Sequence, residues 1–168
     1  GIKTRAVRDG DDWIINGSKT YITNAATADW LCLLVVTDPG AGYGGSSQIL
    51  VPTDTPGFRY ELLDKIGNWG SDTGLLFFED MRVPLDAMLG AEGQGYRIAL
   101  GNLEGGRIGI AAQALGMARA AYEVALAYAQ EREAFGKPIF EHQAVAFRLA
   151  DMATQLAAAR QLIWHAAA

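Results

Sequence analysis

The feature that most constrains the fold is one change of pattern near residue 90. Before it, short runs of β-branched and aromatic residues alternate with turns, and after it apolar residues recur at helical spacing. Short alternating runs predict β-strands, whereas a period of about 3.6 residues predicts amphipathic helices. We therefore predict an α+β chain, with an antiparallel, β-barrel-like domain over residues 1–90 and a helical domain over residues 91–168.

The first half of the chain predicts several short strands. We expect a turn at Asn16-Gly17 and a flexible hairpin tip in the glycine-rich segment 38–45, because Asn-Gly and glycine clusters favour turns. The single cysteine, Cys32, lies in an apolar run and is expected to be a buried structural thiol. The predicted strands are Ile2–Val7, Trp13–Ile15, Thr20–Thr23, Trp30–Thr37, Ser47–Val51, Phe58–Leu62, and Gly74–Glu79 with Arg82-Val83 after it.

The second half predicts two long helices. One apolar stripe runs from Leu115 to Ala129 and another from Val145 to Ile163, each at helical spacing. Gly136-Lys137-Pro138 separates them, and glycine and proline both end helices. We therefore predict two long antiparallel helices of a helical bundle. A strand opens the sequence without a preceding turn, and the last helix has no stop signal, so we expect truncation at both ends.

Charge and composition exclude several functions. The net charge of −5 argues against a broad nucleic-acid or anionic-membrane surface. One cysteine and two histidines without partners at ligand spacing argue against a metal site. No apolar stretch approaches the roughly 20 residues of a membrane span. A bacterial cytoplasm or, in a eukaryote, the mitochondrial matrix is the expected location.

Two arginines are candidates for ligand binding. Arg132 stands at the end of the first predicted helix, where it either pairs with Glu131, Glu133 or a helix C-terminus, or reaches a phosphate with its planar fork. Arg107 is the only cation between Ile98 and Met117, and it either forms a buried ion pair with Glu104 or faces a ligand.

Four segments resemble the acyl-CoA dehydrogenase family, in the family's order. Together they cover nearly the whole chain and agree with the change from strands to helices. The segments are Asn16–Asn24 with Ala28-Asp29; Asp54–Phe58 with Gly70–Thr73 and Phe78–Pro84; Gly93–Tyr96 with Leu103–Ala112; and Gln130–Ile139 with Gln143 and Leu149–Ala153.

The resemblance implies FAD as the cofactor. Tyr21, Ile22 and Thr23 match the strand that packs against the flavin ring, with Thr23 offering hydrogen bonds near the reactive N5 edge. The family often has tryptophan where this chain has Tyr21. Tyrosine still supplies an aromatic wall, so we expect flavin binding to be kept, while the shape of the pocket beside the ring stays open from the sequence.

The resemblance also implies a cofactor site shared between subunits of a homotetramer. Arg132 matches the arginine that reaches the pyrophosphate of the flavin bound by a neighbouring subunit. Phe135 and Gln143 match residues beside the adenosine of that cofactor, with His142 alongside.

The reaction that the resemblance implies is α,β-dehydrogenation of an acyl-CoA to the trans-2-enoyl-CoA, as in fatty acid β-oxidation. Glu104 and Arg107 match positions that line the thioester site, and an electron-transfer flavoprotein is the implied acceptor. Some members carry the catalytic base immediately before the matched arginine, where this chain has Gly106. Glu104 lies about 200° away around the helix. We therefore expect the base to lie outside these residues, and the chain alone to be inactive.

Two alternatives stay open from the sequence. Acyl-CoA oxidases and flavin monooxygenases share the resemblance, and a chain without a base could also be an inactive binding or assembly fragment. The acyl chain length is not encoded in these residues alone. Gly105-Gly106-Arg107 resembles the short-chain and branched-chain members of the family, and we expect short or medium acyl groups.

Overall fold

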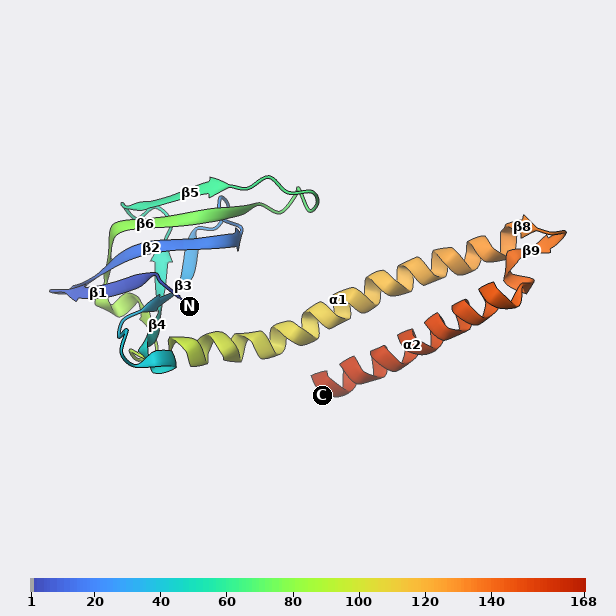
Figure 1. The fold of residues 1–168 in the computed structure, drawn as a ribbon. Coiled ribbons are helices and arrows are strands. Elements are labelled where there is room, and N and C mark those ends of the chain that lie inside the picture. The colour runs from blue at the N-terminus through green and yellow to red at the C-terminus, as the bar shows by residue number, and fades with distance from the viewer. Residues whose placement is uncertain (1) are drawn as a thin grey trace. The chain divides into compact units, whose positions relative to one another are not determined.

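The computed structural model describes residues 2–168, so Gly1, the first residue of the predicted β-domain, lies outside the described residues. The chain forms two compact units (Figure 1). One runs to Gly101 and the other comprises Asn102–Ala168. The boundary between the β-domain and the helical domain at residue 90 stays a prediction.

The first unit is built on a seven-stranded sheet, whose strand order is β5-β6-β2-β1-β3-β4-β7 (Figure 1). All pairs are antiparallel except β1 with β3, which meet at the single parallel pair Arg5–Val36. The sheet is not closed into a barrel, because β5 and β7 end it within the described residues. The strands are β1 (Arg5–Asp9), β2 (Asp12–Thr23), β3 (Trp30–Val36), β4 (Ser46–Pro52), β5 (Phe58–Leu62), β6 (Thr73–Pro84) and β7 (Met88–Leu89), with short 3₁₀ turns at η1 (Gly42–Gly45) and η2 (Leu85–Ala87).

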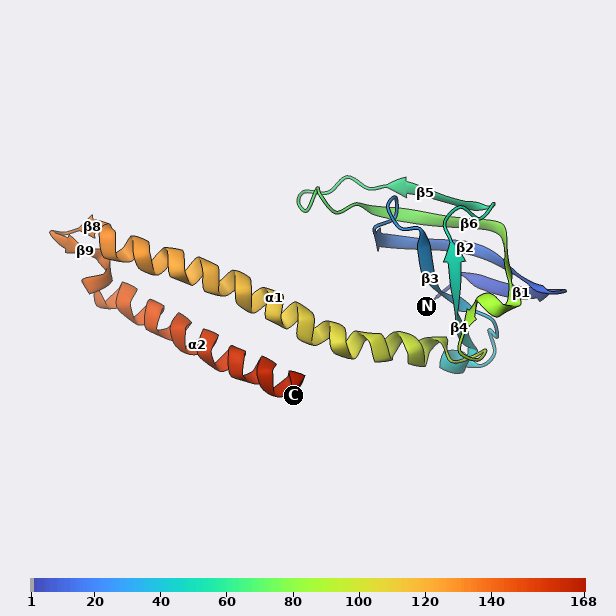
Figure 2. The same cartoon turned by 180° about the vertical axis from the view of Figure 1, so that it is seen from behind.

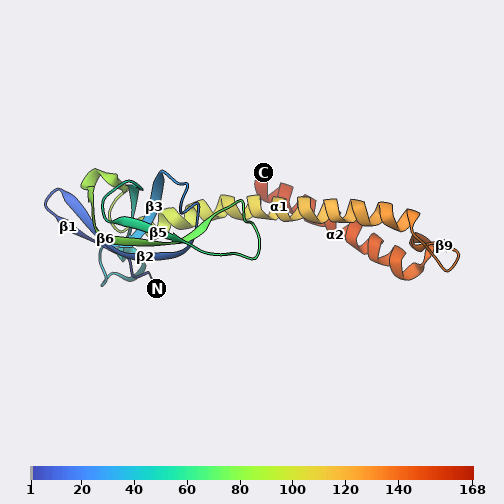
Figure 3. The same ribbon diagram turned by 90° about the horizontal axis from the view of Figure 1, so that it is seen from above.

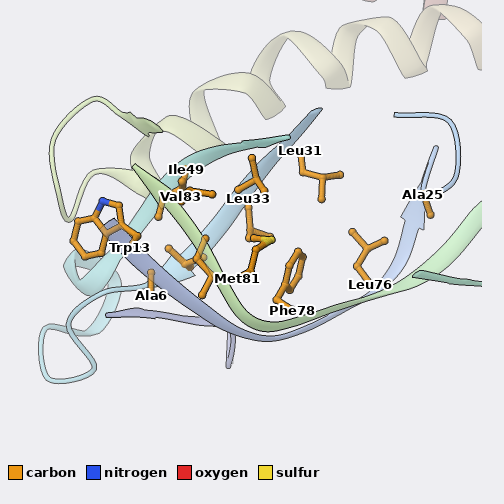
Figure 4. Packing of buried hydrophobic residues seen from close by; sticks show 13 residues of the cluster. Ala6, Trp13, Ala25, Leu31, Leu33, Ile49, Leu76, Phe78, Met81 and Val83 are labelled. Atoms are coloured by element: carbon orange, nitrogen blue, oxygen red, sulfur yellow. The ribbon is translucent and has the colours of Figure 1, made fainter. Parts of the chain in front are cut away.

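The core of this unit lies between two layers of the bent sheet. In Figure 4, β3 and β4 cross the layer that contains β2 and β6, and the buried side chains fill the space between them. Phe78, Ile15 and Met81 are among the largest fully buried side chains. On each side of a bulge between Phe78 and Met81, their burial follows the strand alternation, since every second residue faces the core.

The turn predicted at Asn16-Gly17 is wrong, because β2 continues through both residues. A bulge interrupts its pairing with β6 between Ile15 and Gly17. Gly17 has φ +136°, and a Cβ there would lie 2.7 Å from Thr4 Cα. Glycine is needed for this close approach of two backbones rather than for a reversal of the chain.

The prediction of a buried thiol is also wrong, because Cys32 is exposed. Residues of β3 alternate between two faces, and its neighbours Leu31 and Leu33 occupy the buried one. The side-chain amide of Gln48 donates a hydrogen bond to Cys32 Sγ at 3.0 Å.

The second unit is a pair of antiparallel helices, as predicted. They are α1 (Gly95–Glu131), which begins in the first unit, and α2 (Gln143–Ala167), and they lie side by side in Figures 1 and 2. Figure 3 shows their connection, formed by β8 (Glu133–Ala134), β9 (Lys137–Pro138) and the 3₁₀ turn η3 (Ile139–Glu141). An apolar groove of about 840 Å³ runs between the helices, lined by stripe residues that include Leu115, Tyr122 and Leu156. An α+β fold with an antiparallel sheet and two long helices is therefore confirmed.

Candidate functional site

The end of β2 presents an exposed aromatic side chain on a strained backbone. Tyr21 lies in a second bulge of the β2–β6 pairing, between Lys19 and Ile22, and its φ is +58°. A bulky residue is rare in this left-handed region, where it costs free energy. The side chain is nevertheless 77% exposed, so no packing within the described residues accounts for the strain.

The two residues after Tyr21 face opposite sides of the sheet. Ile22 packs against the hydrophobic core, whereas Thr23 is exposed and pairs with Thr73 of β6. A ligand on the solvent side of this edge can therefore reach the side chains of Tyr21 and Thr23. It can reach only the backbone of Ile22.

The neighbouring loop is anchored by Asp72. Its carboxylate accepts a hydrogen bond from the Ala26 N–H at 2.6 Å, and its backbone carbonyl accepts one from the Asn24 N–H at 3.2 Å. These contacts link the loop after β2 to the loop between β5 and β6. Tyr21 and Thr23 therefore stand at an edge that tertiary hydrogen bonds hold in place.

A second aromatic residue is presented in the helical unit, at the tip of the β8–β9 hairpin. Phe135 and Gly136 form its two-residue loop, with φ of +55° and +81°. Positive φ at both positions is typical of a type I′ turn, which favours Asn-Gly. Phenylalanine is unusual there, and its side chain is 97% exposed.

His142 supports the hairpin at the start of α2. Its Nε2 lies 3.0 Å from the Ala134 carbonyl oxygen, and its ring meets the Phe135 ring edge-on, with centroids 6.1 Å apart. Gln143 follows as the first residue of α2 and is exposed. The structure thus brings Phe135, His142 and Gln143 together at one end of the helical pair.

Arg132 lies at the same end. Its N–H donates to the Tyr128 carbonyl at 2.8 Å, and its own carbonyl accepts from the Ile139 N–H at 2.8 Å, so the backbone is fixed on both sides. The pairing with Glu131 or Glu133 that the sequence left open is not formed: over residues 2–168, no carboxylate lies within ion-pair distance of the guanidinium.

Glu104 and Arg107 lie on α1 and are both exposed. The alternative of a buried ion pair between them is therefore wrong. Within the described part of the chain, neither side chain has an ion-pair or hydrogen-bond partner, and both remain open to a ligand. A Cβ at the intervening Gly106 would meet nothing within 4 Å.

Two further observations concern absences among residues 2–168. No group of three or more histidine, cysteine, aspartate or glutamate side chains is arranged to hold a metal ion. Neither long helix combines the length and apolarity that a bilayer-spanning helix requires.

The β unit also contains a pocket that the sequence did not predict. Lys3 and Arg5 line it, together with the stacked rings of Tyr43 and Tyr96. The available signals were Tyr43, in the glycine-rich segment 38–45 that the sequence predicts only as a hairpin tip, and Tyr96, directly after Gly93 and Gly95.

Comparison with known proteins agrees with this geometry. The acyl-CoA dehydrogenase middle domain matches residues 1–81 and the C-terminal domain of the same family matches residues 93–168. The chain is 47% identical over 165 residues to the mitochondrial short-chain specific acyl-CoA dehydrogenase of Bos taurus, covering 98% of this chain and 40% of that protein. The chain therefore spans less than half the length of such relatives.

Solved structures give the same result. The chain matches butyryl-CoA dehydrogenase from Megasphaera elsdenii with a TM-score of 0.93 and 44% identity, covering 98% of this chain and 44% of the other. It also matches the prolyl acyl carrier protein oxidase AnaB with a TM-score of 0.94 and 32% identity, covering 99% and 44%. With both domain matches in order along almost all of its length, the chain belongs to the acyl-CoA dehydrogenase family.

Proposed function

We propose that the protein carrying this chain is an FAD-dependent acyl-CoA dehydrogenase. It converts an acyl-CoA thioester to the trans-2-enoyl-CoA, with loss of a proton from the α carbon and of a hydride equivalent from the β carbon. FAD supplies the acceptor for that hydride equivalent when it is bound. The residues of this chain bind and orient the cofactor and the thioester.

One observation carries the proposal. Five non-glycine residues in the described chain have positive φ, and three of them are asparagine or aspartate, which tolerate that region. The other two are Tyr21 and Phe135, and both are exposed. Strain that supports no internal packing is typical of residues held ready for a ligand, and these two match the family's flavin contacts.

The residues present fit FAD. An isoalloxazine is planar and carries polar groups along its edge, which suits the Tyr21 ring and the Thr23 hydroxyl at a fixed sheet edge. A pyrophosphate needs a cation that is not already paired, which suits Arg132. Phe135 provides an exposed ring for adenosine, with His142 behind it and Gln143 beside it.

The two contact regions are proposed to serve different flavins of one assembly. We assign Tyr21 and Thr23 to the cofactor of their own subunit, and Arg132 and Phe135 to that of a neighbouring subunit in a homotetramer. Support comes from the exposure of all four residues and from the family match. An electron-transfer flavoprotein is the proposed acceptor of the electrons.

For the thioester, Glu104 and Arg107 are proposed as binding residues on α1. Neither is placed to replace a base at Gly106, so the base that removes the α proton is proposed to lie outside residues 1–168. A short acyl group is favoured by the relatives named for short-chain and butyryl-CoA substrates. A bacterial cytoplasm or the mitochondrial matrix is the proposed location, since both kinds of relative occur.

The test uses the full-length protein. We expect a flavin absorption band near 450 nm, bleaching of that band by butyryl-CoA without oxygen, and reduction of an artificial dye. Rapid peroxide release on admission of air would instead identify an oxidase. Absence of bound flavin after supply of FAD, or no bleaching by any acyl-CoA, would refute the proposal.

A further inference from the structure

Asn16-Gly17 is the only asparagine–glycine pair in the sequence, and both residues are exposed to solvent. In a flexible chain, the backbone nitrogen of the glycine loses its proton and attacks the side-chain carbonyl carbon, Cγ, of the asparagine. A C–N bond forms, ammonia leaves, and a cyclic imide results. Water then opens the imide at either carbonyl and gives aspartate or isoaspartate, with no oxidation or reduction. Glycine favours this reaction because it has no side chain to hinder the attack.

The folded chain holds the Asn16 side chain away from the attacking nitrogen. Asn16 Nδ2 donates to the Asp80 carboxylate at 3.0 Å, and the Asp80 N–H donates to Asn16 Oδ1 at 2.9 Å. Both polar atoms of the amide are therefore bound by β6, which lies beside β2 (Figure 1). Asn16 also lies within β2, whose backbone is extended. Ring closure requires both hydrogen bonds to break and the backbone to leave this extended geometry.

A second set of contacts restrains β2 at the same point. Gly17 approaches the segment before β1 so closely that a Cβ would lie 2.7 Å from Thr4 Cα. Thr4 is buried, and its hydroxyl donates to the Ser18 carbonyl at 2.8 Å. Thr4 and Asp80 thus fix the bulge of β2 from two neighbouring segments. A reactive pair that is open to solvent is protected by these contacts and not by burial.

The products of the reaction do not fit the same contacts. Hydrolysis replaces the Nδ2 donor by a carboxylate oxygen, so a second carboxylate faces that of Asp80, and like charges opposite one another are destabilising. Arg5 is paired opposite Asn16 on β1, but an exposed ion pair contributes little. Isoaspartate also adds a methylene group to the backbone, which disturbs the pairing of the strand. Both products weaken the strand that carries Tyr21 and Thr23.

We propose that Asn16 is a deamidation site whose rate is controlled by its contacts with Asp80. In the folded protein the reaction is slow, because the contacts with β6 must open first. In an unfolded or locally opened chain the reaction is fast. Once formed, the acid at position 16 lowers the stability of the β2–β6 pairing, so that modification promotes further opening. The modification does not depend on the proposed enzymatic function, since water is the only co-reactant.

The rate test uses the full-length protein, incubated at mildly alkaline pH with and without urea. Peptide mapping by mass spectrometry gives the fraction of acid at position 16, which should form at least about tenfold more slowly in the folded protein than in the unfolded one. Asp80→Gly removes the carboxylate and suits the φ of +46° at this position. It should raise the rate in the folded protein by about tenfold or more, because a charge-assisted hydrogen bond is lost. Asp80→Asn keeps an acceptor oxygen and tolerates positive φ, so this matched control should stay within about threefold of the wild type.

Unfolding in urea tests the product separately. Asn16→Asp should lower the unfolding midpoint, and Asp80→Asn added to it should restore the midpoint, because an amide at position 80 can donate to the acid at position 16. Equal deamidation rates in the folded and unfolded wild type would overturn the proposal. So would a wild-type rate in a folded Asp80→Gly protein, with folding checked by circular dichroism. If Asp80→Gly does not fold, failure of Asp80→Asn to rescue Asn16→Asp would equally overturn the role of Asp80.

Discussion

Replacement of Phe135 by asparagine should raise the thermal stability of the protein and weaken its binding of flavin. Phe135 occupies the first position of a two-residue hairpin loop with φ +55°, followed by Gly136 with φ +81°. Asn-Gly is the preferred pair for such a loop, because asparagine tolerates the left-handed region. The native phenylalanine is therefore expected to be retained for binding and not for folding.

The magnitude follows from two opposing terms. The left-handed conformation costs an ordinary residue about 1–2 kcal/mol, most of which asparagine avoids. Loss of the edge contact with the His142 ring costs about 0.5 kcal/mol, at the low end for an aromatic pair because Phe135 is 97% exposed. A net gain of about 1 kcal/mol raises the melting temperature by roughly 2–4 °C in a chain of this size.

Thermal unfolding followed by circular dichroism, without added FAD, measures the first effect, and flavin retained after gel filtration measures the second. Phe147→Asn is the matched control, since Phe147 is also exposed but lies within α2. Phenylalanine and asparagine have similar helix propensities, so that variant should change stability by no more than about 0.3 kcal/mol and keep its flavin. A Phe135→Asn protein that melts at or below the wild-type temperature would refute the argument from strain, and one that retains flavin normally would refute the assigned contact.

Three further predictions concern binding, packing and pH. Arg132→Gln should weaken FAD binding by about tenfold or more without changing stability. Arg119→Gln, which breaks an exposed ion pair on α1, is the control and should leave FAD binding unchanged. Flavin fluorescence titration measures FAD binding for both variants. Gly17→Ala should cost at least about 2 kcal/mol in urea unfolding because its Cβ would clash with backbone, and Gly10→Ala, at positive φ with open space, only about 1 kcal/mol. Burial lowers the pKa of Lys19 from its usual 10.5, so in the window between the folded pKa and 10.5 the unfolded chain binds more protons and stability rises with pH. Lys19→Met should remove that rise from the pH dependence of the urea unfolding midpoint below pH 10.5, and an unchanged pH dependence would contradict it.

The secondary structure was largely predictable because its signals are local. Phe58–Leu62 was predicted with the bounds that β5 has in the structure. The two helical stripes were also predicted, and residues of both line the groove between α1 and α2. In each case the period of apolar residues reports directly on which face is buried.

The course of β2 was not predictable, because its determinants are far apart in sequence. Asn16-Gly17 has the composition of a hairpin turn, but here the Asn16 side chain bonds Asp80 across the sheet. Its amide donates to the Asp80 carboxylate at 3.0 Å, and its carbonyl oxygen accepts from the Asp80 N–H at 2.9 Å. A partner 64 residues away overrides the local preference.

The site was predictable only through family resemblance. Periodicity cannot show that Tyr21 sits in a bulge or that Phe135 adopts positive φ, since both depend on pairing with a neighbouring strand. The resemblance implies that these residues contact the cofactor. The structure adds that both side chains are exposed on a backbone with positive φ. The structure also distinguishes Ile22 from Tyr21 and Thr23, because the Ile22 side chain packs against the core whereas the other two are exposed.

The two regions proposed to contact FAD lie on units that differ in how many hydrophobic residues they bury. Tyr21 and Thr23 lie on a unit whose core contains 13 buried hydrophobic residues. Among the described residues of the helical unit, only Ala129 and Leu149 are buried hydrophobics, while the groove between the helices remains apolar and open. An apolar face without cover contributes little to stability, because the hydrophobic effect acts only on surface removed from water. The stability of the helical pair that carries Arg132 and Phe135 therefore depends on a further apolar surface packing into this groove. In the proposed tetramer, cofactor binding and subunit assembly must then stabilise one another.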